Sequence, residues 1–384
     1  MKIAIIGTRG IPNHYGGFEQ FAEYLSLGLV NRGHQVTVYN SHDHPYQEKT
    51  WNGVEIIHCF DPEDRIGTKG QFVYDFNCIS DTRKRNYDII LQLGYTSSSV
   101  WGWLLPRKKS VVTTNMDGLE WKRMKFTPKV RRFLKFAERL GVLYSDYLIS
   151  DSIGIQEHIK ESYNKDSLYI PYGANLFLDP DLSCLKQYGV EPYKFNMLIA
   201  RLEPENSIEI ILDGVVLSKK TEPFLVIGNH NTVFGTHLKD KFKDCNHIKF
   251  VGGLYDMQVL NNLRHFSNLY FHGHTVGGTN PSLLEAMSSQ ALIVAHNNIF
   301  NGSILGKDAY YFLNAEDVRG YMDNIDKTAE VLKIEANEHK IADTYSWENI
   351  IDQYESHFKN IVRTKVPLVV NTPIEKKQVE VVHR

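Results

Sequence analysis

Short apolar runs alternate with amphipathic segments along most of the chain. The segment 2–6 is almost wholly apolar, a polar loop follows over 7–17, and apolar residues then recur at helical spacing up to Leu29. A continuous apolar run is typical of a parallel strand covered on both faces, and the wider spacing is typical of a helix with one buried face. Strands that alternate with helices predict a parallel, doubly wound α/β sheet.

The same alternation occurs in both halves of the chain. In the first half the predicted strands are 2–6, 36–39, 54–58, 88–93, 110–114, 147–150 and 168–171, and helical patterns include 69–85, 128–143 and 153–163. In the second half the predicted strands are 195–200, 224–227, 248–251, 269–271, 292–295 and 310–312, with helices including 207–217, 257–265 and 281–289. We therefore predict two facing Rossmann-like domains, 1–172 and 173–345, a closing helix over 346–362 and a low-order tail over 363–384.

The bulk composition narrows the function classes. With 42% apolar residues the chain can build real cores, and a net charge of −2 does not favour nucleic-acid binding. The four cysteines form no CxxC pair, which fits a reducing compartment and argues against disulfides or a structural zinc. HExxH is absent and no apolar run approaches the roughly 20 residues that span a bilayer. We expect a cytoplasmic protein with no metal and no cofactor.

The stretch from Gly277 to Met287 carries the most chemistry. Glycines precede a predicted helix, and the free N–H groups at a helix N-terminus favour an anion such as a phosphate. Glu285, one turn inside, offers a fixed carboxylate for sugar hydroxyls. The alternative is an ordinary loop–helix junction with a solvated Glu. The pair Gly16-Gly17 opens another helix in the same way, although the dinucleotide motif GxGxxG is absent. Both loops follow strands, so they can converge on one interdomain cleft.

Several motifs resemble those of a known enzyme family. They are Ile6-Gly7-Thr8-Arg9-Gly10-Ile11-Pro12, Tyr15-Gly16-Gly17-Phe18-Glu19 and Asn115-Met116-Asp117-Gly118-Leu119-Glu120-Trp121-Lys122-Arg123. Together with the two-domain pattern they resemble retaining GT-B glycosyltransferases of family 4, in the bacterial rhamnosyltransferase branch. The resemblance covers roughly residues 1–362. It implies a nucleotide-sugar-binding second domain, an acceptor-binding first domain and an active site between them.

The resemblance also implies roles for individual residues. Arg201 matches an Arg that grips the donor diphosphate, and Asn206 stands where that family has a Lys, so Arg9 or backbone amides would meet part of the phosphate charge. Glu285 matches a Glu that holds the ribose. Gly277 replaces a Glu that faces the transferred sugar. The segment around Asp117 occupies the place of a catalytic-site His or Asp.

These arguments give one set of candidate site residues. The catalytic candidates are Asp117, Arg201 and Glu205, and the substrate-binding candidates are Arg9, Gly16, Gly17, Glu19, Asn206, Asn229, His230, His274, Gly277, Gly278, Thr279, Asn280 and Glu285. Each has a structural alternative: Arg201 as a surface ion pair, Asp117 as a helix cap, Glu19 as a first-turn dipole partner. Asn229 and His230 would then lie in a plain loop.

The segment 122–136 is strongly basic, whereas the chain as a whole is nearly neutral. Lysines and arginines alternate there with apolar and aromatic residues. A basic amphipathic helix can lie on an anionic membrane, and lipid-diphosphate-linked saccharides are the acceptors of the resembled branch. This predicts peripheral contact at the inner face of the plasma membrane. The alternative is a solvated helix face.

The sequence thus predicts a glycosyltransferase that moves L-rhamnose from dTDP-rhamnose to a lipid-linked or oligosaccharide acceptor in cell-surface polysaccharide synthesis. The nucleotide sugar is a substrate, not a cofactor. Two alternatives remain open: a non-hydrolysing sugar-nucleotide epimerase, which shares the two-domain architecture, and a non-catalytic sugar-nucleotide-binding protein. The departures at Gly277 and Asn206 favour the second.

Overall fold

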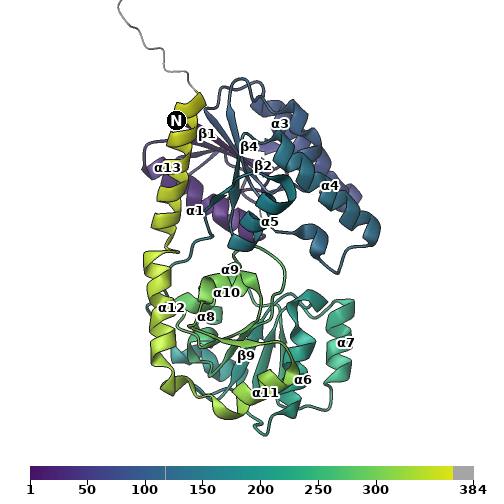
Figure 1. The fold of residues 1–384 in the computed structure, drawn as a ribbon, viewed down its shortest axis with the longest axis vertical. Coiled ribbons are helices and arrows are strands. Elements are labelled where there is room, and N and C mark those ends of the chain that lie inside the picture. Colours follow the sequence, from purple (N-terminus) through teal and green to yellow (C-terminus); the bar gives the residue numbers. More distant parts are fainter. Residues whose placement is uncertain (117, 366–384) are drawn as a thin grey trace, which may run out of the picture.

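The chain folds into two α/β domains, one above the other in Figure 1. The structure is a computed structural model, and it describes residues 1–116 and 118–365. The first domain holds an eight-stranded sheet of order β3-β4-β2-β1-β5-β6-β7-β8, and the second a six-stranded sheet of order β11-β10-β9-β12-β13-β14. All pairings are parallel except that of β3 with β4. The predicted architecture of two doubly wound domains is confirmed.

The first domain comprises the elements up to β8. Its strands are β1 (Lys2–Ile6), β2 (Gln35–Ser41), β3 (Thr50–Trp51), β4 (Val54–Cys59), β5 (Ile89–Leu93), β6 (Val111–Asn115), β7 (Tyr147–Ser150) and β8 (Leu168–Tyr169). Its helices are α1 (Gly17–Asn31), α2 (Glu63–Ile66), α3 (Gly70–Thr82), α4 (Pro128–Tyr144) and α5 (Ile153–Tyr163), with 3-10 turns η1 (Gly67–Lys69), η2 (Ser98–Leu104) and η3 (Glu120–Lys122). The short edge strand β3 escaped prediction because it carries no apolar run.

The second domain follows the same alternation. Its strands are β9 (Asn196–Ile199), β10 (Phe224–Ile227), β11 (Ile248–Gly252), β12 (Tyr270–His272), β13 (Ile293–His296) and β14 (Tyr310–Phe312). Its helices are α6 (Ile208–Leu217), α7 (Val233–Lys241), α8 (Met257–Phe266), α9 (Pro281–Ser288), α10 (Ile299–Leu305), α11 (Ala315–Asn324) and α12 (Val331–Asp343). The 3-10 turns are η4 (Leu182–Tyr188), η5 (Pro204–Asn206) and η6 (Lys327–Ala329).

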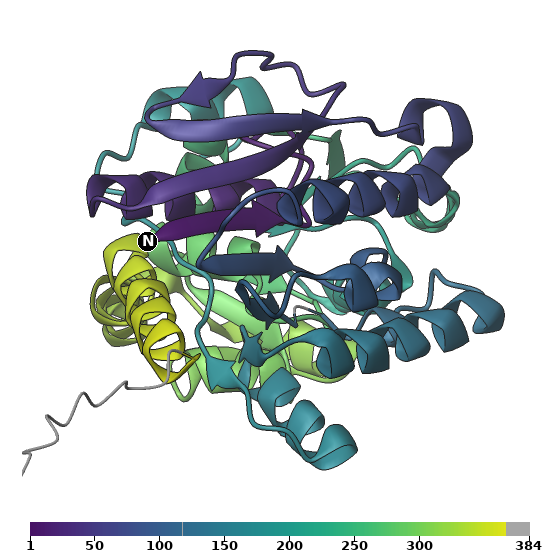
Figure 2. The same ribbon diagram turned by 90° about the horizontal axis from the view of Figure 1, so that it is seen from above.

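The last helix, α13 (Trp347–Lys365), returns the chain to the first domain. Trp347 stacks on Tyr24 of α1 with ring centroids 4.5 Å apart. A Cβ on Gly28 would lie 2.4 Å from Ile351, so glycine lets α1 and α13 approach closely. The amino terminus lies beside α13 in Figure 1 and in the view from above in Figure 2. The helix predicted over 346–362 thus links the domains; the predicted tail beyond 365 lies outside the described residues.

The domains join at a seam of aromatic residues. The chain crosses between them before Ala174 and again at Ser346, and these two residues form a β-bridge. Tyr172 and Trp347 pack edge to face nearby, with ring centroids 5.0 Å apart. Because the strands of each sheet are parallel, their carboxyl ends gather at one edge, and loops from both edges face the space between the domains. This seam fixes where the cleft lies.

Candidate active site

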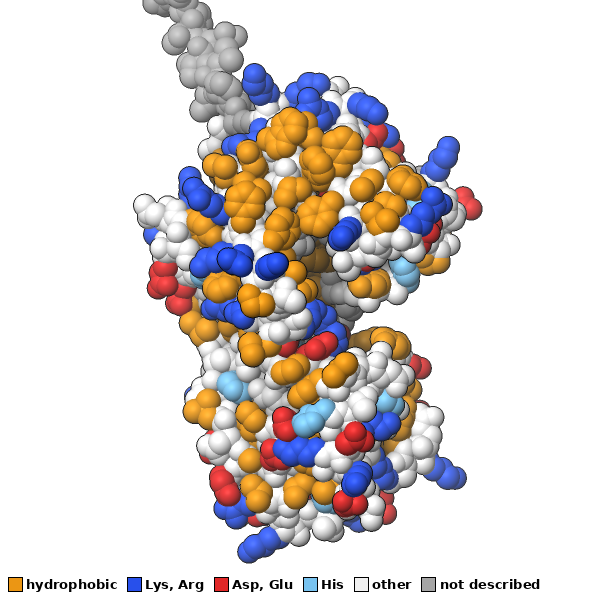
Figure 3. All heavy atoms as spheres, turned by 90° about the vertical axis from the view of Figure 1, so that its right-hand side faces the viewer, with side chains coloured by type: hydrophobic (Ala, Val, Ile, Leu, Met, Phe, Trp, Pro, Cys, Tyr) orange, Lys and Arg blue, Asp and Glu red, His pale blue; other side chains and the backbone are white. Residues whose placement is uncertain are grey.

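A cavity of about 810 Å³ lies between the two domains. Figure 3 shows the molecule hollowed at its waist. Loops that follow β1, β6 and β7 line it from the first domain, and loops that follow β9, β10, β11 and β12 line it from the second. The predicted site residues that line the cavity are Gly16, Gly17, Arg201, Asn229, His274, Gly277, Gly278, Thr279, Asn280 and Glu285. The two glycine-rich loops therefore do converge on one cleft.

Five other predicted site residues do not line the cavity. They are Arg9, Glu19, Glu205, Asn206 and His230. Glu205 and Asn206 are buried within the short turn that follows β9. The Asn206 side chain donates to the Arg201 carbonyl at 2.7 Å, so it braces the loop that carries Arg201. Asp117 lies outside the described residues.

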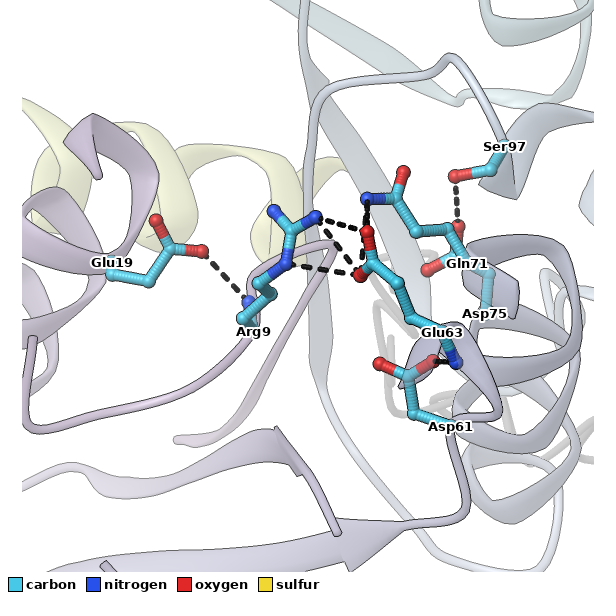
Figure 4. A network of polar contacts seen from close by, with 7 residues as sticks. All are labelled: Arg9, Glu19, Asp61, Glu63, Gln71, Asp75 and Ser97. Carbon is cyan, nitrogen blue, oxygen red and sulfur yellow. Dashed lines mark hydrogen bonds and ion pairs between the residues drawn. The ribbon is translucent and has the colours of Figure 1, made fainter. Parts of the chain in front are cut away.

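Arg9 and Glu19 form ion-pair and hydrogen-bond contacts within the first domain, as Figure 4 shows. The Arg9 guanidinium forms an ion pair with Glu63 at 2.8 Å and lies over the Tyr15 ring at 3.9 Å. Glu19 accepts from the Thr8 hydroxyl at 3.1 Å and from the backbone N–H of Arg9 at 2.8 Å. The ligand roles of Arg9 and Glu19 stay predictions; in the structure each side chain makes its polar contacts within the first domain.

A buried carboxyl group lies close enough to this network for the charges of Asp61 and Arg9 to act on it. Figure 4 shows Asp75 beside Ser97, whose hydroxyl donates to it at 2.6 Å. Burial raises the pKa of Asp75 to about 7. Glu63 also accepts from Gln71, and its backbone N–H donates to Asp61. The loop after β1 is therefore held by an extended polar network of its own domain.

Arg201 has a different environment. It is exposed, it follows β9, and it faces the cleft. Arg123 lines the cleft from the opposite domain and is itself paired with Glu120 at 2.6 Å. Burial, with the nearby charges of Arg201 and Arg123, lowers the pKa of His274 to about 3. Burial and the same two arginines lower the pKa of Lys125. Cations of both domains thus gather beside a neutral imidazole, where an anion would relieve their mutual repulsion.

The loop before α9 presents its backbone to the same cleft. Asn280 caps the helix by accepting from the Ser282 N–H at 2.9 Å, and Pro281 occupies its first turn. Gly277 has φ +143°, and a Cβ built on it would meet nothing within 4 Å. This φ favours glycine, while the free space leaves room for a ligand. The helix end remains directed at the cleft.

Glu285 is oriented by a buried arginine. Its carboxylate accepts from Arg264 at 2.7 Å, and the Arg264 side chain is 1% exposed while that of Glu285 is 20% exposed. Arg264 also donates to the Ser282 hydroxyl at 3.0 Å. Arg264, itself held by Ser282, therefore fixes the carboxylate of Glu285, which lines the cavity. Sequence reasoning missed Arg264; a cation among the apolar positions of α8 was the available signal.

Within residues 1–116 and 118–365, no three His, Cys, Asp or Glu side chains are grouped so that they could hold a metal ion. In the same ranges, no helix combines the length and apolar character needed to cross a membrane.

Comparison with solved structures identifies the fold type. The chain matches a sucrose-phosphate synthase from Thermosynechococcus elongatus with a TM-score of 0.77 at 14% identity, over 94% of this chain and 99% of the other. It matches Anabaena HepE in complex with UDP and glucose with a TM-score of 0.71 at 16% identity, over 94% and 100%. The fold is of the GT-B type. A third match within this type is an α,α-trehalose 6-phosphate synthase from Burkholderia multivorans, with a TM-score of 0.69 at 11% identity, over 95% and 99%.

Comparison of the sequence with known families says less about function than the fold does. A family model described as a domain of unknown function (DUF1972) matches residues 1–175, which is the first GT-B domain and the start of the crossing. No curated protein matches the chain.

Proposed function

We propose that the chain is a retaining glycosyltransferase that binds a nucleotide-sugar donor in the interdomain cleft. The observation that carries the proposal is the meeting of Arg201 and Arg123, from opposite domains, beside neutral His274. A donor diphosphate would supply an anion to this cluster, in which Arg123 is paired with Glu120 while Arg201 is exposed to the cleft. The GT-B fold supports the proposal, as do the complexes of Anabaena HepE, whose descriptions name UDP, UDP-glucose and glucose.

The chemistry requires stabilisation of the leaving diphosphate. As the bond between the sugar carbon and the diphosphate breaks, negative charge grows on the diphosphate and positive charge on the sugar carbon. Arg201 can donate charge-assisted hydrogen bonds to the departing oxygens, and the N-terminus of α9 adds its backbone dipole. Glu285, held by Arg264, accepts hydroxyl groups of the ribose. The residues present therefore suit a diphosphate leaving group without further groups in the cleft.

The donor sugar is the finer part of the proposal. Gly277 leaves open space within 4 Å of its Cβ position, where a larger side chain would contact the ligand. A pocket without a polar partner at this point does not select for a hydroxyl group there. Together with the resemblance of the first-domain motifs to rhamnosyltransferases, this favours a 6-deoxy sugar, and we propose L-rhamnose carried as dTDP-rhamnose.

The acceptor is proposed to be a lipid-linked saccharide, taken from a membrane surface. Apolar side chains gather on one face of the first domain, with Lys and Arg at the margins (Figure 3). The exposed large apolar residues of α3, η2 and α4 are Val73, Phe76, Trp103, Val130, Phe133, Phe136 and Leu143. Trp103 is 63% exposed and Phe136 is 53% exposed. Such a patch is typical of a binding surface, and its basic margin fits anionic lipid.

The basic residues of segment 122–136 include two groups, one that contacts Trp121 and one that is exposed beside the apolar patch. Arg131 donates to the Trp121 carbonyl at 2.7 Å, and Lys135 lies 4.7 Å from the centroid of the Trp121 ring. Lys129 and Arg132 are exposed beside the apolar patch. The membrane surface we propose therefore extends beyond this segment onto α3 and η2, while part of the segment stabilises the first domain.

Liposome sedimentation tests the membrane surface. Vesicles with anionic lipid should bind the wild-type chain, and Trp103→Ser with Phe136→Ser, or Lys129→Gln with Arg132→Gln, should weaken binding, at about 1 kcal/mol per lost charge. Lys219→Gln with Lys220→Gln, in the second domain, is the matched charge control. Equal binding by the control and patch variants would contradict this surface.

A donor screen tests the transferase proposal against its alternatives. Nucleotide sugars should be screened by thermal shift, and a selective donor at 100 times its dissociation constant should stabilise the chain by about 2.7 kcal/mol. Transfer to a lipid-linked acceptor, with the anomeric configuration of the product determined by NMR, would support a retaining enzyme. Turnover of UDP-N-acetylglucosamine without an acceptor would indicate an epimerase. Donor binding without transfer across an acceptor panel would indicate a binding protein.

A further inference from the structure

Asp151 reaches from the first domain into the second. It directly follows β7, and its Oδ2 accepts a hydrogen bond from the backbone N–H of Thr279 at 3.2 Å. The Asp151 backbone carbonyl also accepts from the Thr279 hydroxyl. Asp151 is 7% exposed and Thr279 4% exposed. A carboxylate of one domain is therefore buried against the loop that opens α9 in the other.

The contact requires a residue without a side chain at Gly278. A Cβ built on Gly278 would lie 2.0 Å from Asp151 Oδ2, so any side chain there would expel the carboxylate. Gly277, next to it, has open space instead. The two adjacent glycines thus serve different purposes: one gives room to a ligand, and the other lets Asp151 approach bare backbone.

Other contacts also join the domains at this edge of the cleft, among them a side-chain hydrogen bond between Tyr169 and Thr279. Val276 and Phe300 of the second domain pack on an apolar cluster of the first that includes Ile155. A Cβ on Gly154 would lie 2.7 Å from Phe300, so α5 and α10 also meet closely here. The aromatic seam around Tyr172 lies at the chain crossings. Asp151 is thus the charged contact that accompanies an apolar one.

The Thr279 N–H is also where a phosphate is expected to bind. It lies one residue before the Asn280 cap, at the positive end of α9, and it lines the cleft. Asp151 already places a negative charge there. A diphosphate that approached this backbone would be repelled by the carboxylate and would compete with it for the same donor. Arg123 and Arg201 would attract the diphosphate from either side.

We propose that Asp151 is an interdomain latch that the donor diphosphate displaces, so that its charge sets donor affinity. The inference rests on the proposed function, because it takes the ligand to be a nucleoside diphosphate group. In the free protein Asp151 joins the domains. In the complex the diphosphate takes over the Thr279 N–H and joins the domains itself, through Arg123 on one side and Arg201 on the other.

Two substitutions separate the charge from the hydrogen bond. Asp151→Asn keeps an oxygen that can accept from Thr279 but removes the charge, so dTDP should bind about tenfold more tightly while the free protein stays compact. Asp151→Ala removes the charge and the side-chain hydrogen bond and keeps only the backbone contact with the Thr279 hydroxyl, so the free protein should show a larger radius of gyration, and dTDP should restore the compact form. Asp166→Asn is the matched control: Asp166 is 90% exposed and pairs with Lys160 at the surface, so it removes the same charge far from the cleft.

The test combines calorimetric titration of dTDP with small-angle X-ray scattering on the full chain. Tighter binding by Asp151→Asn, with the control within about twofold of wild type, supports the latch. Equal or weaker binding by Asp151→Asn overturns it, because the carboxylate would then not oppose the ligand. A radius of gyration of free Asp151→Ala equal to that of the wild type also overturns the latch, since the Asp151 side chain would then not hold the domains together. If the wild-type chain binds no nucleoside diphosphate, the proposed function fails, and the scattering still decides whether Asp151 joins the domains.

Discussion

The two glycine-rich loops of the molecule look alike in sequence and differ in what they offer a ligand. The loop after β1 carries Arg9 and leads to Glu19 in α1, but both side chains are satisfied within the first domain. The loop before α9 leads to Glu285, whose carboxylate is fixed by Arg264 and lines the cleft. Both loops begin helices at the carboxyl edge of a parallel sheet, so position alone does not distinguish them.

The difference shows that the pairing of charges decides which loop binds. Arg9 pairs with Glu63 at the start of α2 in the same domain, so its positive charge is compensated before any ligand arrives. Arg201 is exposed and lines the cleft, so its positive charge is available to an anion. The donor diphosphate is therefore expected to depend on the second domain much more than on the first loop.

The largest expected effect is that of Arg201→Ala. If this guanidinium stabilises the leaving group, its removal should reduce turnover by about a hundredfold or more, as for the loss of one transition-state donor. Turnover with saturating donor and acceptor is the measurement, and circular dichroism checks the fold. Lys219→Ala, an exposed cation of the same domain, serves as the control. Arg201→Ala activity within about threefold of wild type would contradict this role.

The next effect concerns stability in the first loop network. The pKa of Asp75 is about 7 in the folded protein, above its ordinary value of 3.8. The folded state therefore holds this proton more tightly, and the contribution of Asp75 to stability is present below pH 4 and lost as pH rises through about 7. Asp75→Asn should remove this loss, changing the difference in unfolding free energy between pH 5 and pH 8 by about 2 kcal/mol.

Urea unfolding at the two pH values measures that difference. Unfolding curves of Asp75→Asn that keep the wild-type pH dependence would show that another group titrates instead. The variant does not alter the loop before α9, so donor affinity at pH 8 should remain within about twofold of wild type. This outcome would sharpen the contrast between a loop that stabilises and a loop that binds.

Substitutions at Gly277 examine the open loop. Gly277→Glu should lower transfer from dTDP-rhamnose by about tenfold or more, because the carboxylate would enter the space of the donor sugar and lie poorly paired. Gly277→Ala carries the cost of the left-handed φ of +143° but meets no atom within 4 Å. The difference in transfer rate between the two variants therefore gives the effect of the carboxylate alone, without that of the backbone. Full activity in Gly277→Glu would show that this position does not face the donor sugar.

The smallest effect belongs to the Arg9–Glu63 pair. The two side chains are 25% and 27% exposed, so solvent screens their interaction. Arg9→Met should cost about 1 kcal/mol of unfolding free energy, and Glu63→Gln a similar amount, with a double variant that costs less than the sum. Turnover of each variant should stay close to wild type. A large loss of turnover with unchanged stability would assign Arg9 to the substrate and break the comparison.

Much of the fold follows from local sequence. Strand positions were predictable because the apolar runs of parallel strands are buried on both faces, and they agree with the structure within a residue or two. The glycines and the Glu of the α9 loop were also predictable, since helix ends have recognisable cap residues. Prediction from sequence failed where no periodic pattern exists, as at β3, which was missed.

The pairings within the site could not be predicted in the same way. Glu63 and Arg264 meet their partners through the tertiary fold, and nothing in the local sequence indicates those contacts. Asp151 offered a partial signal, because it follows directly on a predicted strand at the edge where ligands bind. Its contact with Thr279 crosses between domains, so its partner could be known only once both domains were placed.

The most direct test of the account is calorimetric titration of dTDP into the wild-type, Arg9→Met and Arg201→Ala chains. The account predicts binding by the wild type and, within about twofold, by Arg9→Met, with an affinity at least about tenfold weaker for Arg201→Ala. The reverse order, with affinity lost in Arg9→Met and kept in Arg201→Ala, would contradict it, because the anion would then bind the loop after β1.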